Sequence, residues 1–303
     1  ITVGENSIAN AWNSTNSAIN ISIPVGDDES LDSGRVQIIA KVANNDFENL
    51  DSYLFFQSND LNNSKIVSVS ESLVESISGF LENDTITIGA IIYDVPGNMT
   101  VGSESNTKLV INQSIPIIIN SNIESDFSYS SLSGVDNIIT LIFETDTEII
   151  IPSVTISGQE AIIVNLGDNE WQASYTMQSS DEDGIIPFVI DFMDVYGNPN
   201  SVINSTEDGT SVTFDNSKPS LSFVSIKSSN QDTTFAKVGD TITIIFEADE
   251  VLTSQIASIN SNNTEITSIN EGLLTKYYAK YVMENTDNEG DINFEIIVSD
   301  SIG

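Results

Sequence analysis

The chain has 303 residues and carries 45 acidic side chains against 9 basic ones, a formal net charge of −36. A chain this negative is repelled by phosphate backbones and by anionic lipid surfaces, so we expect no nucleic-acid partner. The absence of His and Cys excludes catalysis, zinc ligation and disulfides that depend on those residues.

No apolar run in the sequence approaches the roughly 18 residues that span a bilayer, so we expect no direct membrane insertion in this segment. The hydrophobic content is 39%, which is enough for a packed core. The chain opens at Ile1 without a basic signal-peptide region, so we expect a processed or excised part of a longer polypeptide.

Side-chain alternation predicts strands along the whole chain. Apolar residues take every second position within residues 36–42, 171–177 and 240–247, a period typical of half-buried strands. Turn-forming pairs separate such runs: Gly97-Asn98, Asp183-Gly184, Gly197-Asn198 and Asp208-Gly209. Several strands per 100 residues with frequent turns predict an all-β fold built from β-sandwiches.

One segment, residues 72–81, has a helical pattern. Ser72 and Glu75 have the spacing of a capping box. Four apolar residues share one helical face: Leu73, Ile77, Phe80 and Leu81. We predict a single short helix here, on a crossover between two strands.

Sequence motifs recur about every 100 residues, which indicates tandem modules. Asp94-Val-Pro-Gly97-Asn98 recurs as Asp194-Val-Tyr-Gly197-Asn198 and, cut short, as Asp300-Ser-Ile-Gly303. Three further pairs of segments recur in the same order: 137–144 with 240–247, 171–177 with 277–283, and Pro116 with Pro219. We therefore predict three modules arranged like beads on a string, at residues 1–115, 116–218 and 219–303.

The first and third modules depart from the repeat. The front half of residues 1–115 aligns with neither of the other modules, so we predict a divergent copy. The third module, residues 219–303, lacks the strand that should follow its last turn. We expect either a continuing polypeptide or a partner that adds the missing strand.

These motifs resemble the bacterial and archaeal Ig-like repeats of giant surface proteins, of the S-layer or adhesin type. There, a strand ends in an Asp-x-x-Gly-Asn turn, and a further strand leads into a polar link that commonly reads Val-Asp-x-Thr-Ala-Pro. Here the link reads Phe214-Asp215-Asn-Ser-Lys-Pro219 and Ile111-Asn112-Gln-Ser-Ile-Pro116. The resemblance covers nearly all of residues 117–303 and the last third of the first module. It implies an Ig-like sandwich fold and leaves the function open.

Calcium is the metal that this composition favours, because Ca²⁺ binds six to eight oxygens from carboxylates, carbonyls and amides. The candidate ligands lie mainly at predicted module ends, with one pair in an acidic run near the start: Asp94, Asn98, Asp194, Asn198, Asp215 and Asp300, then Asp27 and Asp28. The competing interpretation is that these residues form tight turns, for which Asp and Asn are favoured.

Asparagine-linked glycosylation is a further candidate modification. Eight asparagines fit the Asn-x-Ser/Thr pattern: Asn13, Asn20, Asn62, Asn83, Asn98, Asn112, Asn204 and Asn262. A chain this rich in Asn, Ser and Thr produces about that many matches by chance, so the pattern indicates a glycoprotein only in an organism that modifies its surface proteins.

We interpret the chain as a non-enzymatic structural segment of an acidic protein that is secreted to the cell surface. It would act as part of a surface layer or a stalk, and its partners would be divalent cations and further copies or modules of the same protein. Two alternatives stay open: an adhesin or module that binds surface glycans, and an accessory region of a secreted enzyme. Tyr278 is the tyrosine we expect to be exposed for a ligand, with Tyr277 and Tyr281 in the core.

Overall fold

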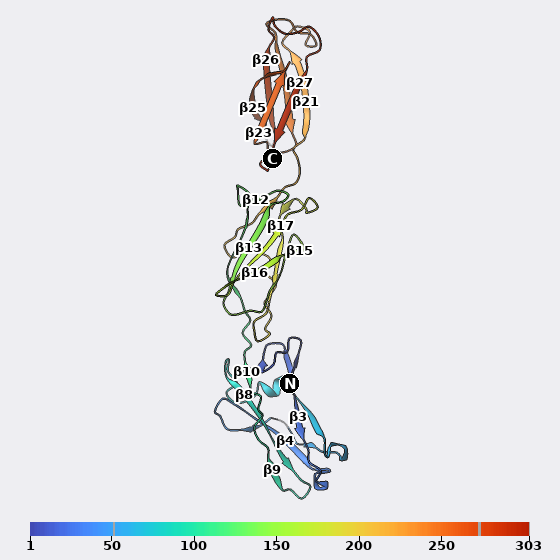
Figure 1. The fold of residues 1–303 in the computed structure, drawn as a ribbon, viewed down its shortest axis with the longest axis vertical. Helices are drawn as coiled ribbons and strands as arrows, with labels where there is room; N and C mark the ends of the chain where they lie inside the picture. Colours follow the sequence, from blue (N-terminus) through green and yellow to red (C-terminus); the bar gives the residue numbers. More distant parts are fainter. Residues whose placement is uncertain (51, 272–273, 303) are drawn as a thin grey trace. The chain divides into compact units, whose positions relative to one another are not determined.

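The computed structural model describes residues 1–50, 52–271 and 274–302, which are almost entirely strands and turns (Figure 1). The chain divides into two compact units. The first holds Ile1–Ile123, Thr140–Tyr175 and Pro187–Thr210, and the second holds Glu124–Ile139, Thr176–Ile186 and Ser211–Gly303. This division crosses the range predicted as the middle module, so the boundaries at 115 and 218 stay a prediction. Each sheet nevertheless lies inside one of the three predicted ranges.

Two sheets form in the described part of residues 1–115. The smaller has the order β1-β3-β7, and the larger has the order β2-β10-β8-β4-β5, with β6 paired to β4 and β9 to β8. Alternate residues of β4, from Val36 to Val42, are buried in the core of this segment, and Gln37 and Ile39 on the other face of the strand are buried as well. The strand bounds are β1 Thr2–Gly4, β2 Ala11–Trp12, β3 Asn16–Pro24, β4 Arg35–Val42, β5 Glu48–Asn49, β6 Leu54–Phe55, β7 Ser64–Ser70, β8 Thr85–Tyr93, β9 Met99–Val101 and β10 Leu109–Ile111.

Residues 116–218 form a four-stranded sheet, β11-β13-β17-β16, and two three-stranded sheets, β12-β20-β18 and β15-β14-β19. The period-two pattern predicted from sequence is present: Trp171, Ala173 and Met177 are all buried. The bounds are β11 Ile118–Ser125, β12 Leu132–Ser133, β13 Ile138–Thr145, β14 Ser153–Ile156, β15 Gln159–Glu160, β16 Ile162–Gly167, β17 Glu170–Thr176, β18 Gly184–Ile185, β19 Phe188–Asp191 and β20 Thr213–Phe214.

In the described part of residues 219–303, the two sheets have the orders β21-β22-β26-β25 and β24-β23-β27. These orders match the A-B-E-D sheet and the paired C and F strands of a constant-type Ig sandwich. Phe246 and Tyr277 face each other across β22 and β26 and stack with ring centroids 5.1 Å apart. The predicted all-β, Ig-like fold is confirmed. The bounds are β21 Leu221–Ser228, β22 Thr241–Ala248, β23 Ser254–Ile259, β24 Asn262–Asn263, β25 Glu265–Glu271, β26 Leu274–Val282 and β27 Phe294–Ser299.

The predicted helix at 72–81 is wrong in length and in its cap. The helix α1 covers only Glu71–Val74, and its N-cap is Ser70 rather than Ser72. Beyond it the chain continues in turns, because Gly79 has φ +80° and serine favours turns over helix interiors. Ile77 is buried, whereas Leu81 is 65% exposed. The other helical elements in the described residues are two short 3₁₀ turns, Glu29–Leu31 and Ser58–Asp60. No helix among the described residues is long and apolar enough to cross a membrane.

The structure aligns the front half of residues 1–115 with residues 116–218, which the sequence alone did not. The short strand β2 pairs in parallel with β10, and β12 pairs in parallel with β20 in the same way, so Asn13 takes the position of Gly134. The hydrogen bonds agree, because Asn16 Oδ1 accepts from Asn13 N at 2.9 Å and Asn137 Oδ1 accepts from Gly134 N at 2.8 Å.

Candidate functional site

The repeated Asp-x-x-Gly-Asn motif forms a closed turn at Asp194–Asn198. Asp194 N donates to Asn198 O at 3.0 Å. In return, the Asp194 carboxylate accepts from Asn198 N and from Asn198 Nδ2, both at 2.8 Å. Gly197 has φ +91°, which explains the glycine at this position. These bonds favour the turn-forming interpretation of Asp194 and Asn198 over the metal-ligand one.

This turn docks, within the first compact unit, into a set of three residues that we call the socket: Asn13, Ser14 and Asn112. Asn198 Nδ2 donates to Asn112 O at 3.0 Å and to Asn112 Oδ1 at 2.8 Å. Ser14 N donates to Asn198 Oδ1 at 2.8 Å, and Asn13 Nδ2 donates to Tyr196 O at 2.7 Å. Asn198 and Asn13 are fully buried, so the docked network is neutral where it contacts the socket and has its polar atoms paired.

The motif forms the same turn at Asp94–Asn98, where it is exposed. Asp94 N donates to Asn98 O at 3.0 Å, and the Asp94 carboxylate accepts from Asn98 N at 2.6 Å and from Asn98 Nδ2 at 2.7 Å. Asp94 is half-buried and Asn98 is exposed. Two predicted calcium ligands therefore lie together here as turn partners.

The third occurrence of the motif brings three carboxylates together, which we call the carboxylate cluster: Asp215, Glu250 and Asp300. Oxygen atoms of all three lie within 4.8 Å of one another. Asp215 follows β20, Glu250 lies in the loop after β22, and Asp300 follows β27. Asp300 is 6% exposed, and the other two are half-buried. The sequence predicted Asp215 and Asp300 as metal ligands but missed Glu250.

The environment of the cluster disfavours the ionised form of Glu250. Burial raises the pKa of the Glu250 carboxyl, and the charges of Asp215 and Asp300 raise it further, with smaller effects from Asp249 and Asp183. Protein donors satisfy part of the cluster, because Ile302 N donates to Asp300 Oδ1 at 2.6 Å and Ser217 N donates to Asp215 Oδ1 at 3.0 Å.

The cluster and the docked network occupy equivalent positions in successive repeats. The Ile117–Asp146 hydrogen bond of one repeat is reproduced by Ser220 and Asp249 in the next, with N–Oδ1 distances of 2.9 and 2.8 Å. With that alignment, three residues of the earlier repeat, in order, correspond to Asp215, Glu250 and Asp300: Asn112, Thr147 and Asp194. Two neutral side chains are thus replaced by acids. This alignment is the signal that could have identified Glu250.

The remaining predicted ligands lie apart from the cluster. Asp28 caps the turn Glu29–Leu31 and accepts from Ser30 N at 2.9 Å, and this backbone hydrogen bond lowers the Asp28 pKa. Asp27 is exposed beside it. The backbone of Asn216 and the hydroxyl of Ser217 both donate to Asp183, in the predicted Asp183-Gly184 turn.

The glycosylation candidates differ sharply in accessibility. Asn13 is fully buried, and its Nδ2 is committed to Asn6 O and Tyr196 O, so a glycan there is incompatible with this packing. Asn20 and Asn112 are half-buried. The other five are exposed: Asn62, Asn83, Asn98, Asn204 and Asn262.

Among the described residues, the three predicted tyrosines do not form an exposed aromatic surface. Tyr277 is buried, as expected, but Tyr278 and Tyr281 are both half-buried. The Tyr281 hydroxyl donates to the Asp287 carboxylate at 3.0 Å, which ties it to the following loop.

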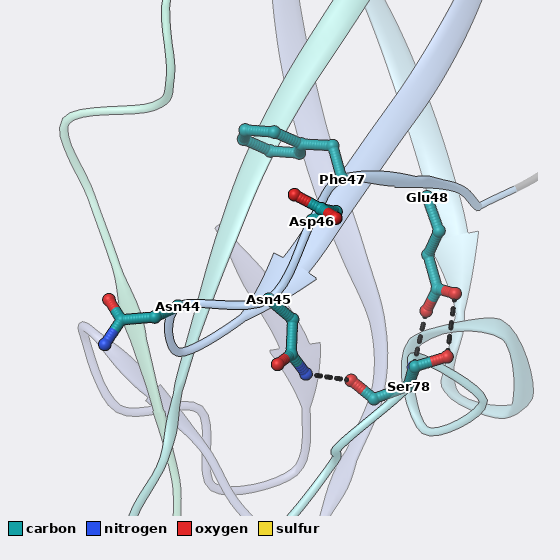
Figure 2. Close-up of a pocket in the computed structure, with 6 residues that line it drawn as sticks. All are labelled: Asn44, Asn45, Asp46, Phe47, Glu48 and Ser78. Carbon is teal, nitrogen blue, oxygen red and sulfur yellow. Dashed lines mark hydrogen bonds between the residues drawn. The ribbon is translucent and has the colours of Figure 1, made fainter.

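A pocket of about 510 Å³ lies at the turn after β4 and is lined by residues 44–48 and by Ser78 (Figure 2). Two of its polar side chains, those of Glu48 and Asn45, are hydrogen-bonded to Ser78. Glu48 accepts from the backbone and hydroxyl of Ser78, and Asn45 Nδ2 donates to Ser78 O at 3.0 Å (Figure 2).

No known protein family and no curated protein matches the sequence. Among solved structures, a 1.5-MDa bacterial ice-binding adhesin, studied for its retention on the host cell surface, has a TM-score of 0.36 and 13% identity over 88% of this chain and 86% of that chain. A tandem from titin has a TM-score of 0.27 and 10% identity, with coverages of 93% and 89%. A marsupial T cell receptor has a TM-score of 0.36 and 7% identity over 94% of this chain and 99% of that chain. Similarity this low carries no argument about function, and the Ig-like fold is established by strand order.

Proposed function

We propose that this chain is a non-enzymatic structural segment of an acidic, extracellular cell-surface protein, in which Ig-like modules serve as spacers. The proposal includes Ca²⁺ binding at the carboxylate cluster. The observation that carries it is the replacement of Asn112 and Thr147 in one repeat by Asp215 and Glu250 in the next, beside Asp300.

The donor set of the cluster suits calcium. Ca²⁺ takes oxygen ligands at about 2.3–2.6 Å and accepts several carboxylates, whereas Mg²⁺ requires a near-octahedral shell and keeps more water. Three carboxylates within 4.8 Å repel one another when ionised, and a divalent cation would remove that repulsion. Because Asp215 lies in the link and the other two lie in loops of residues 219–303, a bound ion would stiffen the link.

The spacer role is supported by repetition. The same turn geometry recurs at Asp94 and Asp194, and the acids that surround it belong to turns rather than to a single cleft. A catalytic site is normally unique in a chain, whereas spacing and attachment benefit from repeated units. An unbalanced acidic surface would also concentrate cations from the medium.

Calcium binding can be tested by calorimetric titration and thermal unfolding of the whole chain. We expect Ca²⁺ at 100 times its Kd to stabilise the wild-type protein by about 2.7 kcal/mol. Glu250→Gln should weaken binding strongly. Asp168→Asn, which removes one exposed acid from a turn outside the cluster, should bind like the wild type. Equal calcium responses in all three proteins would rule out the site.

A further inference from the structure

We propose that the exposed Asp94–Asn98 turn is a docking element that binds a further Ig-like module through a socket built like Asn13, Ser14 and Asn112. This inference goes beyond the proposed spacer role, because it identifies a surface and the kind of partner that it fits. It does not depend on calcium.

The first step is that the two turns share their backbone path and their closing asparagine, although Gly97 N donates to the Asp94 carboxylate where Tyr196 N donates to that of Asp194. In both, the aspartate N to asparagine O distance is 3.0 Å and the glycine N to aspartate O distance is 3.1 Å. The glycines have φ values of +99° and +91°. A side-chain amide of asparagine closes each turn onto its aspartate, at 2.7 and 2.8 Å.

The second step is that the exposed turn presents the atoms with which the docked turn binds. Asn198 uses its second Nδ2 hydrogen for Asn112 and its Oδ1 for Ser14 N. Within the described part of the chain, the Asn98 amide bonds only to Asp94. One Nδ2 hydrogen and the Oδ1 of Asn98, the groups that the docked turn uses, thus stay available on an exposed residue.

The third step is the apolar surface around the exposed turn. Val95 is 61% exposed, whereas its equivalent Val195 is 37% exposed. Met99, directly after the turn, is 62% exposed and pairs with Tyr93 across β8 and β9. Apolar side chains beside unpaired amide groups are typical of a surface that is covered in an assembly.

The fourth step identifies the occupant. A socket must offer a backbone donor, an amide acceptor and room for a glycine without a Cβ. The socket in this chain meets that requirement closely, because a Cβ on Gly197 would lie 2.5 Å from Asn6 O and 2.6 Å from Asn13 Nδ2. The exposed turn has the same backbone, with Gly97 at φ +99°, and nothing lies within 4 Å of the place of its Cβ, so it is free to enter a socket of the same shape. The occupant is therefore a module that ends in such a socket.

The test uses a variant of the full chain in which the docked Asp194–Asn198 turn is displaced, so that its socket can bind a second molecule. Gly197→Val should displace the docked turn, since its side chain cannot fit against Asn6 and Asn13. The freed socket should then accept the Asp94–Asn98 turn of another molecule. We expect head-to-tail association of this variant in sedimentation velocity at protein concentrations up to about 1 mM, the range of effective concentrations that short linkers provide. The wild-type protein should sediment as a monomer over the same range.

The controls separate docking from non-specific association. Adding Asn98→Ala to Gly197→Val should abolish association. If the valine variant does not fold, Gly197→Ala provides a smaller displacement of the same turn. The proposal is overturned if the double variant associates equally well. It is also overturned if the folded single variant stays monomeric while NMR shows the side-chain amides of Asn13 and Asn112 shifted, as expected for an empty socket.

Discussion

At the scale of single residues, the contrast between amide and carboxylate side chains distinguishes the two equivalent sites. Asn112 accepts from a buried amide and carries no charge, so its surroundings close without an ion. Asp215 occupies the matching position and faces two further acids. Asparagine and aspartate differ by one side-chain heavy atom. That difference, together with Glu250, replaces a paired hydrogen-bond network with neighbouring carboxylates whose ionised forms repel one another.

Converting the buried amide to an acid should show how strongly the docked network depends on neutrality. Asn198→Asp removes donors to Asp194 and Asn112 and places a second carboxylate against Asp194, which is 3% exposed. We expect the free energy of unfolding to fall by about 2–5 kcal/mol at neutral pH. The matched variant Asn98→Asp alters the same turn where it is exposed and should lose less than about 1 kcal/mol. Urea unfolding midpoints of the two variants would contradict this if they fell equally.

The raised pKa of Glu250 predicts a pH dependence with a defined sign. A carboxyl whose pKa is raised by folding favours the protonated form, so its ionised form lowers stability at neutral pH and the penalty disappears on acidification. In EDTA, we expect Glu250→Gln to melt above the wild type at pH 7. The difference should shrink as the pH falls through the raised pKa toward about 4.3, the ordinary glutamate value. A difference that is constant with pH would exclude repulsion at Glu250.

At the scale of elements, the segment after β7 shows how an apolar pattern can be helical in spacing without forming a helix. Their spacing predicts Ile77 and Leu81 on one helical face, yet Ile77 is 3% exposed and Leu81 is 65% exposed. We expect Ile77→Ala to lower the free energy of unfolding by about 2–5 kcal/mol, because it leaves a cavity. Leu81→Ala should lower it by about 0.5 kcal/mol or less. Chemical unfolding of both variants measures the difference. Equal losses of stability would instead support the continuous helix predicted over residues 72–81.

The strands could be predicted because burial on one face of a sheet imposes a period of two. Ile242, Ile244 and Phe246 are buried as their spacing requires. The helix could not be judged from spacing alone, because turns also bury apolar side chains at intervals of three or four. Its limits depend on Gly79 and on the serines around it, which act through local backbone preferences.

The candidate site was predictable only in part. Asp215 and Asp300 share a motif with their repeats, so the sequence could place them. Glu250 comes from a loop whose approach to the link depends on how β22 and β27 end. The match between Asn13 and Gly134 was hidden for a similar reason, since it depends on two parallel strand pairs and not on residue identity.

At the scale of the whole molecule, few charges are neutralised internally. Three ion pairs occur among the described residues, Lys41–Glu104, Lys65–Asp60 and Lys276–Glu247, against 45 acids in the sequence. Most of the negative charge therefore faces solvent or counter-ions, and its self-repulsion opposes folding. Stability should depend on cations in two distinct ways, by general screening and by occupancy of the carboxylate cluster.

The two contributions can be separated by comparing salts. Screening shortens the reach of every charge, from about 30 Å at 0.01 M to about 3 Å at 1 M ionic strength, so NaCl should raise the melting temperature of the wild type and of Glu250→Gln in parallel. Occupancy depends on ion size and coordination, so Ca²⁺ should raise the wild-type melting temperature more than Mg²⁺ at the same concentration. Glu250→Gln should lose that preference for calcium and keep the NaCl response. A calcium preference that survives in the variant would show that the ion binds elsewhere on the acidic surface, because the net charge of the chain changes by only one in this substitution.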